Sequence, residues 1–245
     1  FEGPHGSAER FAEYPVPGDL AGMPGDWPKE MPDYLGCCHA LDNAVGKIRA
    51  TLEELGLADD TIIIYTSDHG CHFRTRNSEY KRSCHDGCLR IPMVMAGPGV
   101  PHGYVPRELV SLIDIPPTIL TAGGADVPEI FVGNPLQPLW DGTGRDDWPD
   151  HVYAQISESE CGRTIRTERW KYAVTAEDAG GADPWGSTYR ETYLYDLHAD
   201  PYERNNLVDA PDLEDVRGEL YERMLMRMRQ AHEPPATILP VDITA

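Results

Sequence analysis

The chain has 245 residues, of which 40% are hydrophobic and 25% charged, so it is long enough for one or two domains with a true core. Its formal net charge is −20, and such an acidic surface repels nucleic-acid phosphates and anionic lipids, so we expect no nucleic-acid partner. The longest uncharged stretch near the middle, residues 91–106, is interrupted by prolines and glycines, and we expect no membrane span.

The first part of the chain predicts a helix that leads into a buried strand. Residues 1–33 are rich in Pro and Gly and are expected to form a loop. Residues 61–66 are a continuous, mainly β-branched run, which is typical of a strand covered on both faces. Helix, short loop and buried strand together favour an α/β layer. The helix is indicated by apolar residues on one face, namely Leu41, Val45, Ile48, Leu52 and Leu55.

A second strand and a second helix are expected after a long polar loop. Residues 91–96 indicate another buried strand, and residues 109–120 another apolar segment. Within that segment Asp114 is a plausible helix cap, because two prolines follow it in the first turn. Residues 133–150 are rich in Gly, Pro and Asp and make a candidate boundary. We therefore predict a first domain over residues 1–148.

The last part of the chain predicts a small antiparallel α+β subdomain over residues 149–245. A hairpin turn is expected at Thr167–Glu168, and a final helix over residues 211–232. Short strands followed by one helix are typical of such a unit. The expected strands cover residues 151–157, 163–166, 169–174 and 192–197.

The strongest candidate site is the pair Asp68–His69, directly after the predicted strand 61–66. Ligands of open α/β sheets gather beyond the carboxyl ends of the strands. A carboxylate oxygen and an imidazole nitrogen at this position can reach one divalent cation. The alternative is that Asp68 caps the next segment and that His69 has no special role.

Further candidates lie in loops. Lys81 is one of only four lysines, and its ammonium can hold an anionic oxygen near the metal, although a lone loop lysine is more often a solvated charge. His5 is a candidate because a histidine side chain can protonate a leaving group near neutral pH. His85 and Arg74 are weaker candidates by the same reasoning.

The six cysteines give no clear framework. The segment Cys84–Cys88 has the spacing of a metal knuckle, but no second Cys/His pair stands at zinc-finger spacing. Free thiols, or a single disulfide, are the simpler expectation.

Four motifs in sequence resemble the sulfatase family of the alkaline phosphatase superfamily, over residues 1–232 in all. They are "TIIIYTSDHG", "YKRSCHDGCLRIPMVMAGPG", "LVSLIDIPPTILTAGG" and the pair "RTIRTERWKYAV" and "YLYDLHADPYERNNL". The resemblance implies an α/β fold that is part of an alkaline-phosphatase-like sandwich with a mainly parallel sheet, plus a small C-terminal antiparallel α+β subdomain.

The same resemblance implies the roles of the candidate residues. The family hydrolyses sulfate esters with a formylglycine made from Cys or Ser and a bound Ca²⁺ or another divalent cation. Asp68 and His69 match metal-binding positions, although the second is often Asn. Lys81 matches the lysine that contacts the sulfate group, and His5 the histidine that helps the leaving group depart. His85 falls where relatives often have Tyr, so we expect it to contact substrate.

One departure from the family pattern concerns the nucleophile. No cysteine or serine of this chain begins the family's Cys/Ser-x-Pro-x-Arg motif, and the paired aspartates that complete the metal site are also absent. We therefore expect the chain to be the C-terminal half of a sulfatase, a fragment that needs the missing N-terminal half and its formylglycine. The resemblance also implies a periplasmic or extracellular location.

The substrate is expected to be a small-molecule or polysaccharide sulfate ester. Arg74, Arg163 and Arg166 can face an acidic sugar, but surface charge and hairpin ion pairs explain them equally well. Two other functions stay open. The Asp-His pair is compatible with a phosphonate or phosphate ester hydrolase of the same superfamily. The lack of a nucleophile is compatible with a non-catalytic remnant that binds glycans.

Overall fold

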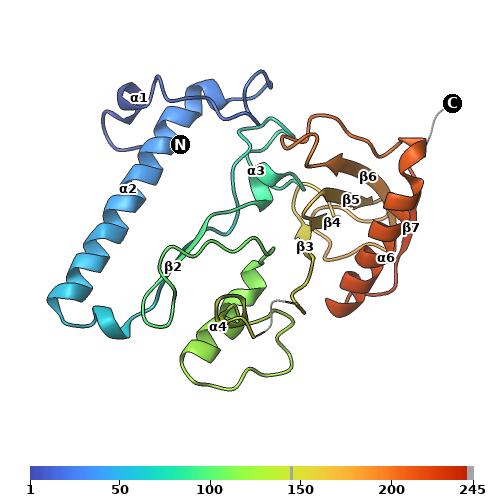
Figure 1. The fold of residues 1–245 in the computed structure, drawn as a ribbon. Coiled ribbons are helices and arrows are strands. Elements are labelled where there is room, and N and C mark those ends of the chain that lie inside the picture. Colours follow the sequence, from blue (N-terminus) through green and yellow to red (C-terminus); the bar gives the residue numbers. More distant parts are fainter. Residues whose placement is uncertain (144–145, 242–245) are drawn as a thin grey trace. The chain divides into compact units, whose positions relative to one another are not determined.

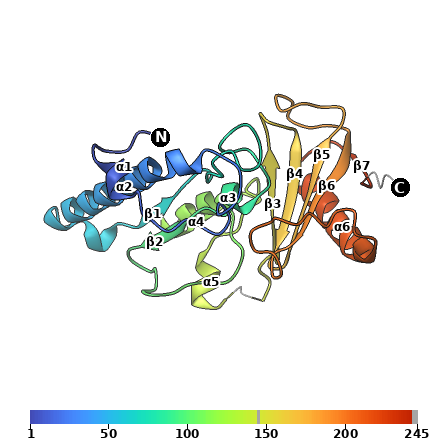
Figure 2. The same ribbon diagram turned by 90° about the horizontal axis from the view of Figure 1, so that it is seen from above.

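The computed structural model describes residues 1–143 and 146–241, which divide into two compact units (Figures 1 and 2). The first unit contains residues 1–81 and 87–102. The second unit contains the short segment 82–86 and the residues from Gly103 onward. We predicted a domain boundary at residues 148/149, which differs from the division into these two compact units. The domain boundary stays a prediction.

The long helix α2, Trp27–Glu54, dominates the first unit and follows the single-turn helix α1, Ser7–Arg10 (Figure 1). The expectation of a loop up to residue 33 was wrong, because α2 begins at Trp27. A proline at the start of a helix loses no hydrogen bond, so Pro28 is compatible with this start. The first turns are held by packing of Met31 against Leu20 and Phe73, which no local pattern reveals.

The apolar face predicted for α2 is largely exposed in this structure. Leu41, Ile48 and Leu55 are 53%, 56% and 64% exposed. The spacing thus predicted the helix correctly, although its apolar side chains are not part of a core among the described residues. No helix in the described ranges combines the length and the apolar character that a membrane span requires.

The sheet of the first unit has two strands in the described residues. The strands β1, Ile63–Thr66, and β2, Met93–Ala96, lie within the predicted ranges. They pair antiparallel, with Ile63 opposite Ala96, whereas we expected a mainly parallel sheet. Parallel neighbours are usually joined through a crossover helix. The connection here contains only the four-residue helix α3, Asp86–Leu89. A short 3-10 helix, η1, Ala58–Asp60, precedes β1.

The second unit begins with short helices around Asp114. These are η2, Leu112–Asp114, α4, Ile115–Ala122, and α5, Gln137–Asp141. The Asp114 carboxylate accepts hydrogen bonds from the backbone N–H groups of Ser111 (2.7 Å) and Asn134 (2.8 Å). The helix α4 begins directly after Asp114, as predicted, but the Asp114 carboxylate caps η2 through Ser111 and makes no cap bond to α4. Burial raises the pKa of this carboxyl.

A five-stranded sheet with the order β3-β4-β5-β6-β7 forms the centre of the second unit (Figure 2). The first four strands pair antiparallel, as predicted. The last strand pairs parallel to β6 and was missed, because three residues give too short a pattern. The strands are β3, His151–Ile156, β4, Gly162–Thr167, β5, Trp170–Ala176, β6, Thr188–Asp196, and β7, Thr237–Leu239.

The predicted C-terminal helix covers one face of this sheet (Figure 2). It is α6, Glu214–Gln230, preceded by the 3-10 helix η3, Pro211–Leu213. Leu220 and Met224 of this helix are buried against Ile165, Tyr172 and Leu194 of the sheet. Such complete burial of aromatic and aliphatic side chains makes this the main core of the described chain.

Candidate functional site

The turn after β1 carries the first candidate site. The Ser67 hydroxyl donates to the His69 carbonyl (2.8 Å), and the His69 backbone N–H donates to the Asp68 carboxylate (3.0 Å). Gly70 donates its N–H to the Cys88 carbonyl (2.7 Å). A Cβ at this position would lie 2.2 Å from the Gly87 carbonyl oxygen, so only glycine allows the turn to pack here.

The structure brings His69 and Lys81 into contact within the first unit. The Nδ1 atom of His69 lies 2.8 Å from the Gly70 carbonyl oxygen, which can only accept, so we assign the ring proton to Nδ1. The Nε2 lone pair then faces the Lys81 ammonium at 2.9 Å. It also lies 3.3 Å from a carboxylate oxygen of Asp68. Two electron-pair donors and one ammonium therefore meet at the end of β1.

The donor set of Asp68 and His69 fits a divalent cation. A carboxylate oxygen and a ring nitrogen that lie 3.3 Å apart can both donate electron pairs to one divalent cation. Partial burial opposes ionisation, but the His69 N–H bond and imidazole outweigh it and lower the pKa of Asp68. In residues 1–143 and 146–241 no group of three or more His, Cys, Asp or Glu side chains can hold a metal, so these two form part of a ligand set at most.

His5 and Arg74 also lie in the first unit. His5 stands in the turn before α1, and its imidazole makes no hydrogen bond or ion pair with any described residue. The Arg74 guanidinium is 58% exposed and pairs with Asp26 at 3.2 Å. Their predicted roles in leaving-group departure and substrate binding therefore stay predictions.

His85 belongs to the second unit and is buried. Its ring is 4% exposed, with Nε2 3.1 Å from the Tyr195 hydroxyl and Nδ1 3.3 Å from the Ser83 hydroxyl. The ring also packs against Tyr193, with the centroids 5.2 Å apart. These contacts lie inside the second unit, and the expected contact of His85 with substrate stays a prediction.

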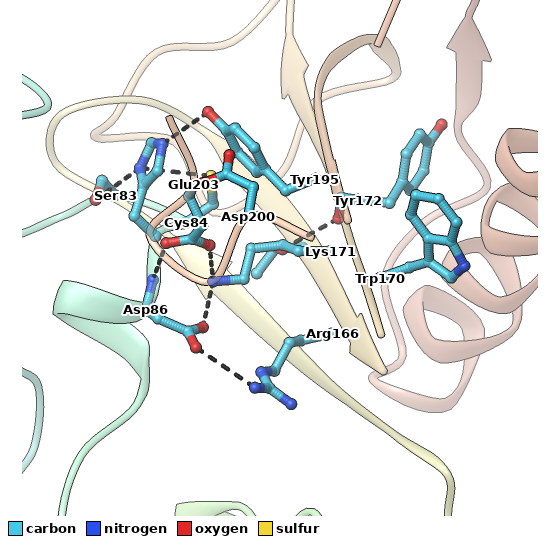
Figure 3. Close-up of polar contacts among 12 residues, drawn as sticks. Ser83, Cys84, Asp86, Arg166, Trp170, Lys171, Tyr172, Tyr195, Asp200 and Glu203 are labelled. Atoms are coloured by element: carbon cyan, nitrogen blue, oxygen red, sulfur yellow. Dashed lines mark hydrogen bonds and ion pairs between the residues drawn. The ribbon is translucent and has the colours of Figure 1, made fainter. Parts of the chain in front are cut away.

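Sequence reasoning missed a buried lysine cluster formed by Asp86, Arg166, Lys171 and Glu203 (Figure 3). Lys171 on β5 is fully buried, and its ammonium forms ion pairs with both carboxylates. The Asp86 backbone N–H donates to Glu203 at 2.7 Å, and the Arg166 guanidinium lies 3.4 Å from Asp86. Two cations thus balance two anions in a protein interior, as buried charges require.

The two carboxyl groups of the buried lysine cluster respond differently to this environment. Burial by itself raises the pKa of Asp86, but the Lys171 ammonium and the Arg166 guanidinium outweigh burial and lower it. For Glu203 burial dominates, and its pKa is raised despite the same lysine. The cluster therefore favours ionised Asp86 and works against ionised Glu203.

One sequence signal pointed to the buried lysine cluster. Only four lysines occur in the chain, and one of them, Lys171, stands within a predicted strand. Arg166 and Arg163, which we considered for an acidic sugar, also have partners inside the second unit. Arg163 is 1% exposed and binds both carboxylate oxygens of Glu233 at 2.9 Å. Both arginines therefore form ion pairs with residues distant in the chain and not within a hairpin, and their contact with an acidic sugar stays a prediction. All six cysteines are free thiols.

Two family models match the chain. The model described as Sulfatase matches residues 1–125, and the model described as N-sulphoglucosamine sulphohydrolase, C-terminal, matches residues 78–231. The two matches overlap and together reach from the first residue to the end of α6.

Individual relatives and solved structures are also similar to this chain over most of its length. N-acetylglucosamine-6-O-sulfatase of Bacteroides thetaiotaomicron is 30% identical over 91% of this chain and 40% of its own length. A protein solved in complex with its substrate D-glucosamine-2-N,6-O-disulfate is 26% identical, with a TM-score of 0.73, over 92% of this chain and 46% of that chain. The phosphonate monoester hydrolase of Agrobacterium radiobacter is 27% identical, with a TM-score of 0.68, over 84% of this chain and 42% of that chain. The chain spans less than half the length of each.

Proposed function

Because this chain belongs to the sulfatase family, we propose that the protein that contains it hydrolyses a sulfate ester. The solved neighbours share the predicted α/β, alkaline-phosphatase-like fold class. The chain corresponds to about 40% of its curated relative, so the reaction is proposed for the whole protein.

The observation that supports this proposal is the convergence of Asp68, His69 and Lys81 at the end of β1. The Lys81 ammonium lies 2.9 Å from His69 Nε2, which in turn lies 3.3 Å from the Asp68 carboxylate. A tetrahedral oxyanion such as sulfate has several oxygens. One can accept a hydrogen bond from the Lys81 ammonium while another contacts a cation held by Asp68 and His69. The Asp68 side chain is 82% exposed, so its carboxylate is accessible to a ligand.

Each of these side chains has a task in the proposed reaction. Lys81 donates N–H bonds to a sulfate oxygen and offsets the charge that develops there. Asp68 and His69 hold a divalent cation, Ca²⁺ in our proposal, which acts as a Lewis acid on the sulfate oxygens when bound. His5 gives a proton to the departing alcohol oxygen.

The attacking group is proposed to lie outside these 245 residues. The chain contains no Cys/Ser-x-Pro-x-Arg motif, from which the family makes formylglycine. We propose that Lys81 holds the sulfate group, and that a formylglycine elsewhere in the protein would supply, as its hydrate, the hydroxyl nucleophile. Without that residue, we expect this chain to be inactive by itself.

The substrate class that we propose is a sulfated amino sugar. A relative carries the name N-acetylglucosamine-6-O-sulfatase, and a solved neighbour binds D-glucosamine-2-N,6-O-disulfate. Arg74 and His85 stay our proposed substrate contacts. The Arg74 guanidinium is the more accessible of the two, because it is 58% exposed while His85 is 4% exposed.

The proposal is tested by turnover of 4-nitrophenyl sulfate and glucosamine 6-sulfate by the full-length protein. Asp68→Ala and Lys81→Ala are each expected to lower kcat/KM by roughly 100- to 1,000-fold, as loss of one transition-state contact does. Lys29→Ala is the matched control, since that side chain is 87% exposed and bonded only to its neighbour Glu30. Full activity of the Asp68 variant with unchanged metal content would contradict the assignment.

The second candidate is a phosphonate or phosphate ester hydrolase. It is favoured by the Asp68–His69 pair and by the likeness to a phosphonate monoester hydrolase. Comparing kcat/KM for aryl sulfate, phosphate and phosphonate esters separates the two, and a sulfatase is expected to prefer the sulfate. Glycan binding without turnover of any ester would instead show a non-catalytic binding protein.

A further inference from the structure

We propose that His72 is a positioning residue for Lys81. The proposed effect is transmitted by a hydrogen bond from the His72 imidazole to the Lys81 backbone carbonyl. This inference rests on the proposed function, in which the Lys81 ammonium contacts the sulfate group. The side chain of His72 itself does not reach the Lys81 ammonium in the described contacts and is given no catalytic role.

His72 closes the loop that ends at Lys81. Its backbone N–H donates to the Tyr80 carbonyl at 2.8 Å, and its Nε2 atom lies 3.1 Å from the Lys81 carbonyl oxygen. The Asn77 side-chain amide donates to the same oxygen at 3.3 Å. One histidine therefore bonds to the last two carbonyl groups of the loop, and this fixes the backbone from which the Lys81 side chain extends.

The state of the imidazole follows from these contacts. A carbonyl oxygen only accepts hydrogen bonds, so Nε2 carries the proton and Nδ1 carries the lone pair. The ring is 2% exposed, and burial lowers the pKa of His72, which keeps the ring neutral. Nε2 is therefore a permanent donor to Lys81 at neutral pH.

This arrangement carries a cost in stability. The buried Nδ1 atom has no hydrogen-bond partner among the described residues. A buried acceptor without a partner destabilises the folded state, whereas an apolar side chain of similar size would avoid this loss. An imidazole at this position is explained if the hydrogen bond from His72 Nε2 to the Lys81 carbonyl oxygen is needed.

The backbone next to His72 is also constrained. Phe73 and Arg74 have positive φ values of 49° and 59°, which non-glycine residues rarely adopt. The Thr75 N–H closes this turn on the His72 carbonyl at 2.9 Å. The turn reverses the chain toward Lys81, and Phe73, 4% exposed, anchors it in the small core. Strained backbone of this kind persists where the surrounding contacts determine it.

Positioning matters for lysine more than for most residues. Its ammonium is a point charge on a flexible four-carbon chain, so the position of the backbone limits where the charge can go. Lys81 reaches across from the far end of the loop to His69 Nε2 at 2.9 Å. A shift of about 1 Å in a group that contacts the reacting atoms can lower the rate by roughly 100-fold.

The test compares three substitutions of His72 in the full-length protein. The side-chain amide nitrogen of His72→Gln reaches the position of Nε2, so this variant keeps the donor. His72→Leu removes the donor, and His72→Asn places its amide near Nδ1 instead. Turnover of 4-nitrophenyl sulfate, inhibition by inorganic sulfate, and hydrogen exchange of the amides of residues 79–82 are measured for each.

The Leu and Asn variants are expected to lose about 10- to 100-fold in kcat/KM, as displaced contacts do, and to bind sulfate about tenfold more weakly. Their amides at residues 79–82 exchange faster. The Gln variant keeps kcat/KM within about threefold of wild type, because the bond is preserved. His151→Leu is the control, since His151 is also buried, with an Nε2 atom that lacks a partner in the described chain. It is expected to lose stability and to keep its inhibition by sulfate.

Two results would overturn the proposal. One is a Gln variant as impaired as the Leu variant, and the other is a Leu variant that binds sulfate and protects residues 79–82 as the wild type does. If the wild type cleaves no sulfate ester, the proposed function fails, but the exchange rates of residues 79–82 still decide whether His72 holds the loop.

Discussion

Each unit contains a lysine beside carboxylates, but the two lysines lie in opposite environments. In the first unit, Lys81 contacts a histidine lone pair, and the neighbouring Asp68 side chain is 82% exposed. In the second unit, Lys171 is fully buried, and its charge is matched by Asp86 and Glu203. The buried lysine cluster leaves little for a ligand to bind. The end of β1 leaves donor atoms that a ligand can use.

Both regions contain charged groups, so charge alone does not distinguish a binding site from a structural cluster. The difference is whether the charged groups already have partners within the folded chain. In a low-dielectric interior an unmatched charge is very costly, so its partners must be present in the folded chain. At an accessible turn, solvent screens the charges, and open coordination positions cost little. Substitutions in the two regions should therefore have opposite consequences for stability and activity.

The largest effect on stability is expected for Lys171→Met. The substitution leaves Asp86 and Glu203 buried without their ammonium partner, and breaking such a pair costs about 3–5 kcal/mol in unfolding free energy. Urea unfolding followed by circular dichroism measures the loss. Lys29→Met, at a side chain that is 87% exposed, is the control and should cause no measurable change. Equal stability of both variants would show that the buried lysine cluster is not held by its charges.

A quadruple substitution, Asp86→Asn and Glu203→Gln with Arg166→Met and Lys171→Met, removes all four charges of the cluster and is expected to recover most of that loss. Replacing a whole buried ion cluster by neutral groups is often close to neutral for stability, within about 1–2 kcal/mol of the wild type. The same unfolding experiment measures it. A quadruple variant no more stable than Lys171→Met would instead show that the loss comes from packing of the lysine side chain.

A smaller effect is expected in the pH dependence of stability. The pKa of Glu203 is raised above its ordinary value of 4.5, so just above pH 4.5 the folded state binds more protons than the unfolded state. This group therefore lowers the unfolding free energy as the pH rises through that window. Glu203→Gln lacks this contribution, and its stability relative to the wild type should increase from pH 4.5 upward. Parallel curves for the two proteins would contradict the raised pKa.

The smallest effect on stability is expected for Asp68→Asn. Its carboxylate is 82% exposed and bonds only to neighbouring residues, so the midpoint of thermal unfolding should not change measurably. The same variant should lose hydrolytic activity under our proposal. A clear fall in the midpoint would place Asp68 among the structural residues and remove the contrast between the two regions.

Local signals predicted much of the fold. Asp114 marked the start of α4, and the apolar patterns located β3 to β6 and α6 to within a few residues. These elements depend on neighbours in sequence, through caps, turns and periodicity. The start of α2 at Trp27 depends on packing against Phe73, and the antiparallel pairing of β1 with β2 depends on the path of the loop between them. Neither is visible in a local pattern.

The same distinction explains what was predicted of the sites. Asp68 and His69 were predicted because they follow a buried strand, and Lys81 was predicted as a scarce lysine in the polar loop. The family resemblance then assigned Lys81 its contact with sulfate. The buried lysine cluster was missed because Asp86, Lys171 and Glu203 are far apart in the chain and meet only through the tertiary fold. A scarce lysine within a predicted strand was the one signal that could have revealed it.

The complete burial of Lys171 has a consequence for chemical labelling. Amine-directed acylating reagents act on accessible lysines, and of the four in this chain the ammonium of Lys171 is shielded. The remaining lysine targets within this chain are Lys29, Lys47 and Lys81, so very few of its peptides carry an acylated lysine. Acylation of Lys81 abolishes the charge that we assign to sulfate binding. The extent of acylation of the Lys81 peptide can be measured relative to the Lys29 and Lys47 peptides, which serve as internal standards.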